Sequence, residues 1–401
     1  MKHIIYILDS LSPFAIYKKN NDHFQNSKSI KNNFFSKLSK DSIFFYNNYG
    51  HGETHSTIYS FLSKKNIYKN NADSFPYAKR NKTDFLNFYN KNKFKKIFFN
   101  NTLIGGSSDR YYEEYFPDFL NSFDLKFLRS TLKNSQNDFE KFCKKINIKN
   151  ILKDNKKILF YIHEMSLHYH KKVFRGGTVE SYMEAVKETG LKIKKDLELI
   201  NYDKKNDTLF FLSDHGMTFR PHDEIFFSKK LTKKKYDQNY YEIFKEKKIK
   251  FVFFIKNPKL KNFNVYNFIH AKDIFKIINL FKEVKFINLL KKILKIKNYL
   301  LFTSLKSAPG SHHYFHKYIR LFMHHHFIFI LDKKKIAYNH AHPHRFVDMN
   351  SMDLINEKKI PERIKIILNK YFSYKNYLKK FFFILLEYII RKLRKHFNNL
   401  K

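Results

Sequence analysis

The chain has 401 residues, of which 43% are hydrophobic and 18% aromatic, and this composition excludes a wholly disordered protein. Its formal net charge of +42 favours an anionic partner, but the lysines are spread along the whole chain without a nucleic-acid-binding motif, so we expect no nucleic-acid partner. The single cysteine, Cys143, excludes a disulfide framework and a multi-cysteine metal site. Because the first residues lack the apolar core and cleavage site of a signal peptide, we predict a cytoplasmic protein.

Six short apolar runs, each ending in polar residues, predict buried β-strands. Between them lie longer stretches in which apolar residues recur at helical spacing, such as residues 181–202. This alternation predicts an α/β fold with a mostly parallel central sheet sandwiched by helices. The runs cover residues 3–9, 42–48, 95–101, 157–164, 207–216 and 250–258.

Open α/β sheets bind ligands at the carboxyl ends of their strands, so the polar residues after each run are the candidate functional residues. Asp9 follows the first run, Thr54 begins a predicted helix after the second, and Asp214 with His215 ends the fifth. Carboxylate and imidazole groups suit zinc or manganese, and a hydroxyl at a helix start can act as a nucleophile. Taken singly, each has a local alternative, because Asp and Thr are also favoured as helix caps and an Asp-His pair can close a turn.

The order of these motifs resembles that of the alkaline phosphatase and sulfatase superfamily. The matching segments are "YILDSLSPF", "GETHSTIYSFLS" and "FLSDHGMTF". The resemblance implies that Asp9, Asp214 and His215 bind a divalent metal ion (Zn, Mn, Mg or Ca), and that Thr54 is the nucleophile and a further ligand. The implied partner is an anionic ester substrate, and the implied fold is alkaline-phosphatase-like.

Other histidines extend the resemblance. By analogy with the lipid phosphoethanolamine transferases, His168 in "YIHEMSLHYHKK" would contact the anionic group of the substrate, and His222 in "RPHDE" would bind substrate or a second metal. Glu164 and His163 are further candidates for a second metal, although a Glu and a His at a strand end often hydrogen-bond each other. A late substrate or metal site could also include the pair His312 and His313.

The sequence also departs from the superfamily patterns. The window "THSTI" has neither the Cys nor the Pro and Arg of a formylglycine site, which favours a Thr nucleophile, and "DS" replaces the usual paired acids after the first strand. The resemblance therefore predicts a metal-dependent hydrolase or transferase of a phosphate or sulfate ester, with a glycan or lipid-linked substrate as a hypothesis. The alternative is a degenerate protein of the same fold that binds a polyanion without chemistry.

We predict a catalytic domain over residues 1–355 and a basic amphipathic helical tail over residues 356–401. The tail could pack as an ordinary helix, or it could attach the protein peripherally to an anionic membrane through its Lys and Arg residues.

Overall fold

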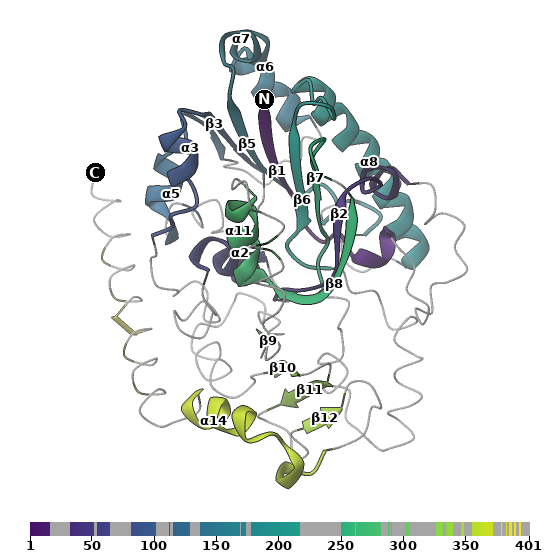
Figure 1. Ribbon diagram of the computed structural model, residues 1–401, viewed down its shortest axis with the longest axis vertical. Helices are drawn as coiled ribbons and strands as arrows, with labels where there is room; N and C mark the ends of the chain where they lie inside the picture. The colour runs from purple at the N-terminus through teal and green to yellow at the C-terminus, as the bar shows by residue number, and fades with distance from the viewer. Residues whose placement is uncertain are drawn as a thin grey trace.

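The computed structural model describes most of the first 281 residues and parts of the remainder (Figure 1). The described residues are 1–16, 33–51, 54–64, 82–101, 112, 115–128, 137–168, 170–173, 178–216, 250–260, 262–281, 288, 290, 301–304, 326–331, 334–339, 346–348, 355–371, 378, 382, 385–386, 389 and 393.

An eight-stranded sheet forms the centre of the fold, with the strand order β4-β3-β5-β1-β6-β7-β2-β8. All neighbouring pairs are parallel except those of β7, which runs antiparallel to both β6 and β2. The predicted α/β fold with a mostly parallel sheet is thereby confirmed. The strands are β1 (Lys2–Leu8), β2 (Ile43–Tyr49), β3 (Lys95–Asn100), β4 (Leu125–Leu128), β5 (Ile158–Glu164), β6 (Thr208–Ser213), β7 (Phe253–Lys256) and β8 (Phe263–His270).

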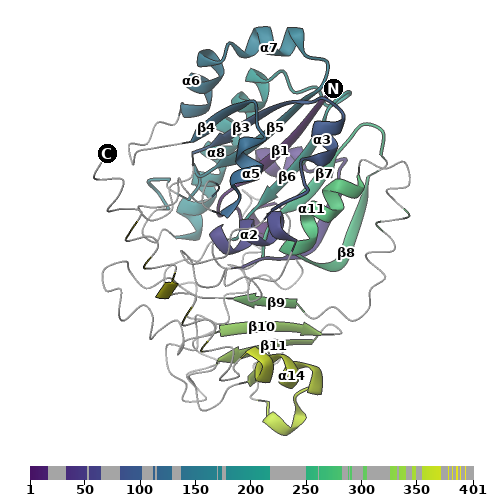
Figure 2. The same ribbon diagram turned by 90° about the vertical axis from the view of Figure 1, so that its left-hand side faces the viewer.

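Helices cover both faces of this sheet, as Figures 1 and 2 show. Side chains alternate along each strand, so Ile5 and Ile7 of β1 pack into one apolar cluster while Ile4 and Tyr6 pack into the other. Both faces are buried, which explains why the central strands are almost continuously apolar.

On the face of Ile5, the cluster includes residues of α2 (Thr54–Ser63), α5 (Pro117–Asn121) and α11 (Ala271–Leu280), together with Tyr89 of α3 (Asn87–Lys91). On the face of Ile4, the cluster includes residues of α1 (Phe34–Leu38), α6 (Asp138–Lys145), α7 (Ile148–Asp154), α8 (Val179–Leu199) and the short 3-10 helix η1 (Pro13–Ala15).

A second, antiparallel sheet of four strands lies beside the main one in both views (Figures 1 and 2). Its apolar residues form a separate cluster with Ile360, Ile364 and Leu368, so α14 packs against this sheet across the predicted domain boundary at residue 355. The boundary itself stays a prediction. The elements are β9 (Leu301–Ser304), β10 (His326–Leu331), β11 (Lys334–Asn339), β12 (Phe346–Asp348), the 3-10 helix η7 (Glu357–Lys359) and α14 (Glu362–Tyr371).

Within the described part of the chain, no helix combines the length and the apolar character needed to cross a membrane.

Candidate active site

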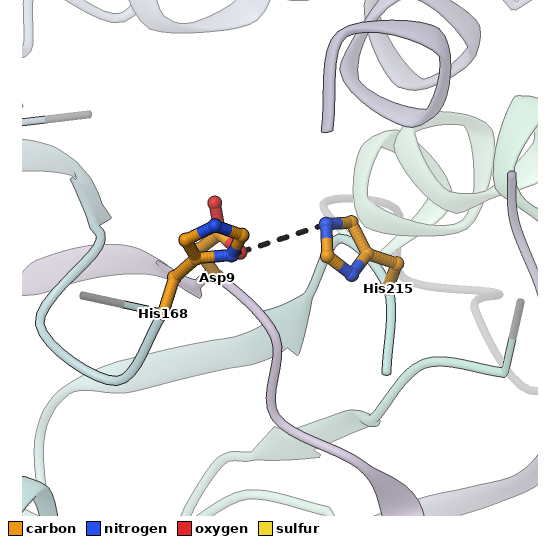
Figure 3. Close-up of side chains that lie close together, drawn as sticks. All are labelled: Asp9, His168 and His215. Carbon is orange, nitrogen blue, oxygen red and sulfur yellow. Dashed lines mark ion pairs between the residues drawn. The ribbon is translucent and has the colours of Figure 1, made fainter. Parts of the chain in front are cut away.

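The candidate site lies at the carboxyl ends of β1, β5 and β6. Because β1 pairs in parallel with both β5 and β6, the residues that follow these strands are brought to the same edge of the sheet. Asp9 follows β1, His168 lies in the segment after β5, and Asp214 and His215 follow β6. Thr54 is the first residue of α2. Figure 3 shows His215 facing Asp9 and His168.

Gly50 directly follows β2, and because it has no side chain, the backbone before α2 can pass close to the end of β6. A Cβ atom at Gly50 would lie 3.1 Å from the Asp214 carbonyl oxygen and 3.1 Å from both Oγ1 and Cγ2 of Thr57. The Thr57 hydroxyl in turn accepts a hydrogen bond of 2.9 Å from the backbone N–H of His51, so it fixes the turn that leads into α2. The missing Cβ of Gly50 therefore permits the close approach to the Asp214 carbonyl, and the bond from His51 to Thr57 ties the residues before α2 to its first turn.

The hydroxyl of Thr54 lies between an acid and an imidazole. Its Oγ1 is 3.1 Å from Oδ2 of Asp9 and 3.2 Å from Nε2 of His215, and its side chain is buried. The backbone N–H groups at the start of a helix lack intrahelical partners, and with the helix dipole they favour an anion near this hydroxyl.

The tautomer of neutral His215 follows from its hydrogen bonds. Nδ1 lies 2.7 Å from the carbonyl oxygen of Gly216, which can only accept, so Nδ1 carries the proton. Nε2 then presents its lone pair to Thr54 and lies 3.6 Å from Oδ1 of Asp9 and 3.6 Å from Oδ2 of Asp214. Nε2 of His215 and one oxygen each of Asp9 and Asp214 therefore converge where a cation would bind.

Burial and the neighbouring charges shift the pKa values of Asp9 and Asp214 in opposite directions. Burial raises the pKa of Asp9, but the imidazoles of His168 and His215 and the hydroxyl of Ser10 outweigh it and hold that pKa well below its usual range. Burial, followed by the charge of Asp9, raises the pKa of Asp214. The raised pKa of Asp214 reflects the cost of burying its carboxylate beside a second one, that of Asp9.

These residues fit a divalent metal ion. Asp9, His168 and His215 each offer one donor atom, and the three atoms lie within 4.8 Å of one another. Oδ1 of Asp214 accepts hydrogen bonds from the N–H groups of Ser10 and His215, whereas the buried Oδ2 accepts none of good geometry from the described residues. A cation would satisfy that oxygen, and carboxylates with imidazole form a donor set suited to zinc or manganese.

Ser10 connects Asp9 to His168. Its Oγ lies 2.5 Å from Oδ1 of Asp9 and 2.8 Å from Nδ1 of His168. With Asp9 ionised, the single hydroxyl proton goes to the carboxylate, so Nδ1–H of His168 donates to Ser10. His168 can bind a metal through Nδ1 only when that nitrogen carries no proton, and it can donate to a substrate oxygen through Nε2 only when Nε2 is protonated. Its side chain is 32% exposed, against 0% for Asp9.

Glu164 and His163, the candidates for a second metal, both have protein partners. The Glu164 carboxylate accepts hydrogen bonds from Asn101 Nδ2 at 2.7 Å and Ser166 N at 3.1 Å, and it pairs with Lys192 Nζ at 3.1 Å. Nδ1 of His163 lies 2.9 Å from the hydroxyl of Tyr112. Lys192 supplies positive charge here, so the hypothesis of a second metal competes with a buried ion pair and stays a prediction.

Three predicted residues, His222, His312 and His313, lie outside the described residues. Sequence reasoning, in turn, missed Ser10 and Lys192. The serine was read only as a missing second acid, and the lysine belongs to a predicted helix without any signal that it reaches Glu164. A serine directly after a strand-end acid is the signal that could have identified Ser10.

The mixed eight-stranded sheet with helices on both faces is an alkaline-phosphatase-like α/β fold. No protein-family model and no curated protein sequence matches the chain. Its structure is similar to that of the lipoteichoic acid synthase LtaP from Listeria monocytogenes, with 13% sequence identity over 94% of this chain and 90% of that one and a TM-score of 0.53.

Two further solved structures share the fold. One is BT1596, a 2-O GAG sulfatase, with 10% identity, coverage of 100% of this chain and 94% of that one, and a TM-score of 0.54. The other is a protein of the alkaline phosphatase superfamily from Vibrio parahaemolyticus, with 10% identity, coverage of 93% and 88%, and a TM-score of 0.51. The structural similarity to this superfamily agrees with the motifs of the sequence, and at these identities it establishes the fold.

Proposed function

We propose that the protein is a metal-dependent hydrolase or transferase of a phosphate or sulfate ester, with Thr54 as its nucleophile. The observation that carries this proposal is the position of the Thr54 hydroxyl at the start of α2, within 3.2 Å of both an Asp9 oxygen and the lone pair of His215. Two proton acceptors beside one hydroxyl, on a helix start that favours anions, are what nucleophilic attack on an anionic ester requires.

The metal-binding residues in this proposal are Asp9, Asp214 and His215, together with Oγ1 of Thr54. A bound divalent cation would lower the pKa of that hydroxyl and screen the charge that develops on the ester oxygens. Asp214 is suited to this role because its buried Oδ2 lies beside the lone pair of His215.

In the first step, the Thr54 hydroxyl gives its proton to Oδ2 of Asp9, and Oγ1 forms a bond to phosphorus or sulfur while the bond to the leaving alcohol breaks. The leaving oxygen takes a proton from His168 or His222, or these residues hold the nonbridging oxygens. In the second step, water or an acceptor alcohol attacks the phospho- or sulfo-threonine and restores the hydroxyl.

A Thr nucleophile is preferred over formylglycine. Cys143, the single cysteine, is buried in α6 on the opposite side of the main sheet from α2 and so cannot be converted into the nucleophile at this site. The substrate is an anionic ester, for which a net charge of +42 is favourable, and a glycan or lipid-linked ester is the hypothesis for its natural form. LtaP is a lipoteichoic acid synthase and BT1596 a GAG sulfatase, so the shared fold leaves both ester classes open. The cytoplasmic location stays a prediction.

The alternative function is polyanion binding without catalysis, which the same charge would support. The two functions differ in metal content and turnover. We expect the purified chain to hold one equivalent of a divalent metal and to hydrolyse at least one nitrophenyl phosphate monoester, phosphate diester or sulfate ester. A chain without stoichiometric metal and without turnover would favour polyanion binding.

The test of Thr54 uses a matched pair of variants. Thr54→Ala should lose turnover while it retains metal, because the carboxylates and His215 remain. The control is Thr189→Ala in α8, since Thr189 is a buried threonine outside the site. Full activity in Thr54→Ala, or an equal loss in both variants, would contradict the proposal.

A further inference from the structure

The buried hydroxyl of Tyr182 contacts the turn that follows β1. Tyr182 lies near the start of α8, and the centre of its ring is 5.5 Å from that of Phe14 in η1. Its Oη accepts a hydrogen bond of 2.8 Å from the backbone N–H of Ser12. The same hydroxyl donates a bond of 3.0 Å to the carbonyl oxygen of Ser10, because a carbonyl can only accept. One side chain of α8 therefore satisfies two buried backbone groups of the turn.

The backbone of this turn has a conformation that needs support. Ser10 has a φ of 66°, in the left-handed region that is unfavourable for a non-glycine residue, and such a conformation persists only where the surroundings fix it. Two contacts come from the end of β6, where the Ser10 N–H donates to Oδ1 of Asp214 at 3.1 Å. There, Oγ of Ser213 also donates to the Leu11 carbonyl oxygen at 2.7 Å. Tyr182 supplies the two contacts that come from α8.

We propose that Tyr182 is a positioning residue of the candidate site, which fixes the turn so that the Ser10 hydroxyl joins Asp9 to His168. Oγ of Ser10 lies 2.5 Å from Oδ1 of Asp9 and 2.8 Å from Nδ1 of His168, so a shift of the turn would change both contacts. The effect of Tyr182 on the site passes through Ser10. The inference rests on the proposed function in so far as Asp9 binds a metal.

The hydroxyl of Tyr182 can be removed without removing its ring. In Tyr182→Phe the packing against Phe14 remains, but the Ser10 carbonyl and the Ser12 N–H lose a buried partner. A buried backbone group without a partner is unfavourable, so the turn should rearrange to find water or another partner. Because the left-handed φ of Ser10 depends on the same contacts, the rearrangement should occur at Ser10.

Tyr6 offers a matched control. Its hydroxyl is also buried and also joins the β1 segment to α8, because it donates a hydrogen bond of 3.0 Å to Oδ2 of Asp196. Asp196 also pairs with Lys192 at 2.8 Å, so it retains a partner in Tyr6→Phe. If the hydroxyl of Tyr182 only attached α8 to the sheet, Tyr182→Phe and Tyr6→Phe should affect the site equally. A positioning role predicts an effect of Tyr182→Phe alone.

The first measurement is hydrogen–deuterium exchange of the full, metal-free chain, resolved to single amides by mass spectrometric fragmentation. The informative amide is that of Ser10, because its bond to Asp214 does not involve Tyr182. Relative to the amides of β3, which report global opening, it should exchange at least about tenfold faster in Tyr182→Phe than in the parent. In Tyr6→Phe it should exchange at the parental rate. A parental rate in Tyr182→Phe, or equal acceleration in both variants, would overturn the proposal.

The second measurement is zinc affinity, by titration against a competing chelator. Residues that orient metal ligands contribute to affinity, so Tyr182→Phe should bind zinc about tenfold more weakly than the parent, and Tyr6→Phe equally well. With cobalt(II) in place of zinc, the visible absorption bands, which depend on ligand geometry, should change in Tyr182→Phe alone. Parental affinity with an unchanged spectrum in Tyr182→Phe would overturn the proposal. A parent that binds no zinc would instead contradict the proposed function, and the exchange of the Ser10 amide would still decide the role of Tyr182.

Discussion

Replacing Ser10 tests whether its hydroxyl organises the site. Ser10 is fully buried and has a backbone φ of 66°, in the left-handed region that favours glycine. Its hydroxyl joins Asp9 to His168, with contacts of 2.5 Å and 2.8 Å. Ser10→Ala and Ser10→Gly both remove these contacts, but only Gly relieves the backbone. The two variants therefore separate the hydroxyl from the backbone conformation.

The expected losses follow from this geometry. A hydrogen bond to a buried charged group contributes about 1.5–3 kcal/mol, so the free energy of unfolding of Ser10→Ala should fall by about that amount. Ser10→Gly should lose about 1 kcal/mol less, because a non-glycine residue in the left-handed region costs about that much. The contacts of Ser10 orient metal-ligand candidates, so zinc affinity should fall about tenfold or more in both variants.

The assays are urea unfolding at pH 7, followed by circular dichroism, and zinc titration against a competing chelator. A free energy of unfolding of Ser10→Ala within about 0.5 kcal/mol of the parent would refute the reasoning about the hydroxyl. Parental zinc affinity in both variants would refute the role of Ser10 in orienting the ligands.

Three further predictions concern the surroundings of the site. Burial lowers the pKa of His163 from its ordinary value of 6.5 to about 4, so this residue contributes stability that is present above pH 6.5 and lost as the pH falls toward 4. At about 1.36 kcal/mol per pH unit, the loss in the free energy of unfolding should reach about 3 kcal/mol. Urea unfolding at pH 7 and pH 4.5 should therefore show a smaller loss at acid pH in His163→Asn than in the parent. Equal losses in the two proteins would contradict this assignment. Gly50→Ala should lower stability by about 1–2 kcal/mol in thermal unfolding, because its Cβ would lie 3.1 Å from the Asp214 carbonyl oxygen, and an unchanged melting temperature would count against that close approach. Burial raises the pKa of Cys143 to about 12, so the native thiol should resist a disulfide reagent at pH 8 and react only as the chain unfolds, whereas rapid native reaction would show that the thiol is accessible.

The sequence predicted the main strands well because burial on both faces requires nearly continuous apolar runs. The run in β1 and the run in β5 are of this kind. The antiparallel direction of β7 could not be predicted, since an apolar run has no sign of strand direction. The edge strand β4 was not predicted either, because only four residues form it and none is fully buried.

The candidate site was predictable to the extent that its residues directly follow strands or begin a helix. Asp9, Thr54, Asp214 and His215 are such residues, and the sheet brings them together. Ser10 contacts His168, which is more than 150 residues away in the sequence, and Lys192 contacts Glu164, which is nearly 30 residues away. Local sequence patterns do not show that such separated residues meet.

The central claim is that Thr54 becomes covalently modified during turnover, and mass spectrometry of the acid-quenched enzyme tests it most directly. The metal-loaded protein is mixed with an excess of an ester that it hydrolyses, quenched in acid, digested and mapped. We predict a phosphoryl or sulfuryl group on the peptide that contains Thr54, and no such group on the same peptide of Thr54→Ala, which should also fail to turn over. Continued turnover by Thr54→Ala, or a modification that maps to another residue, would contradict the account.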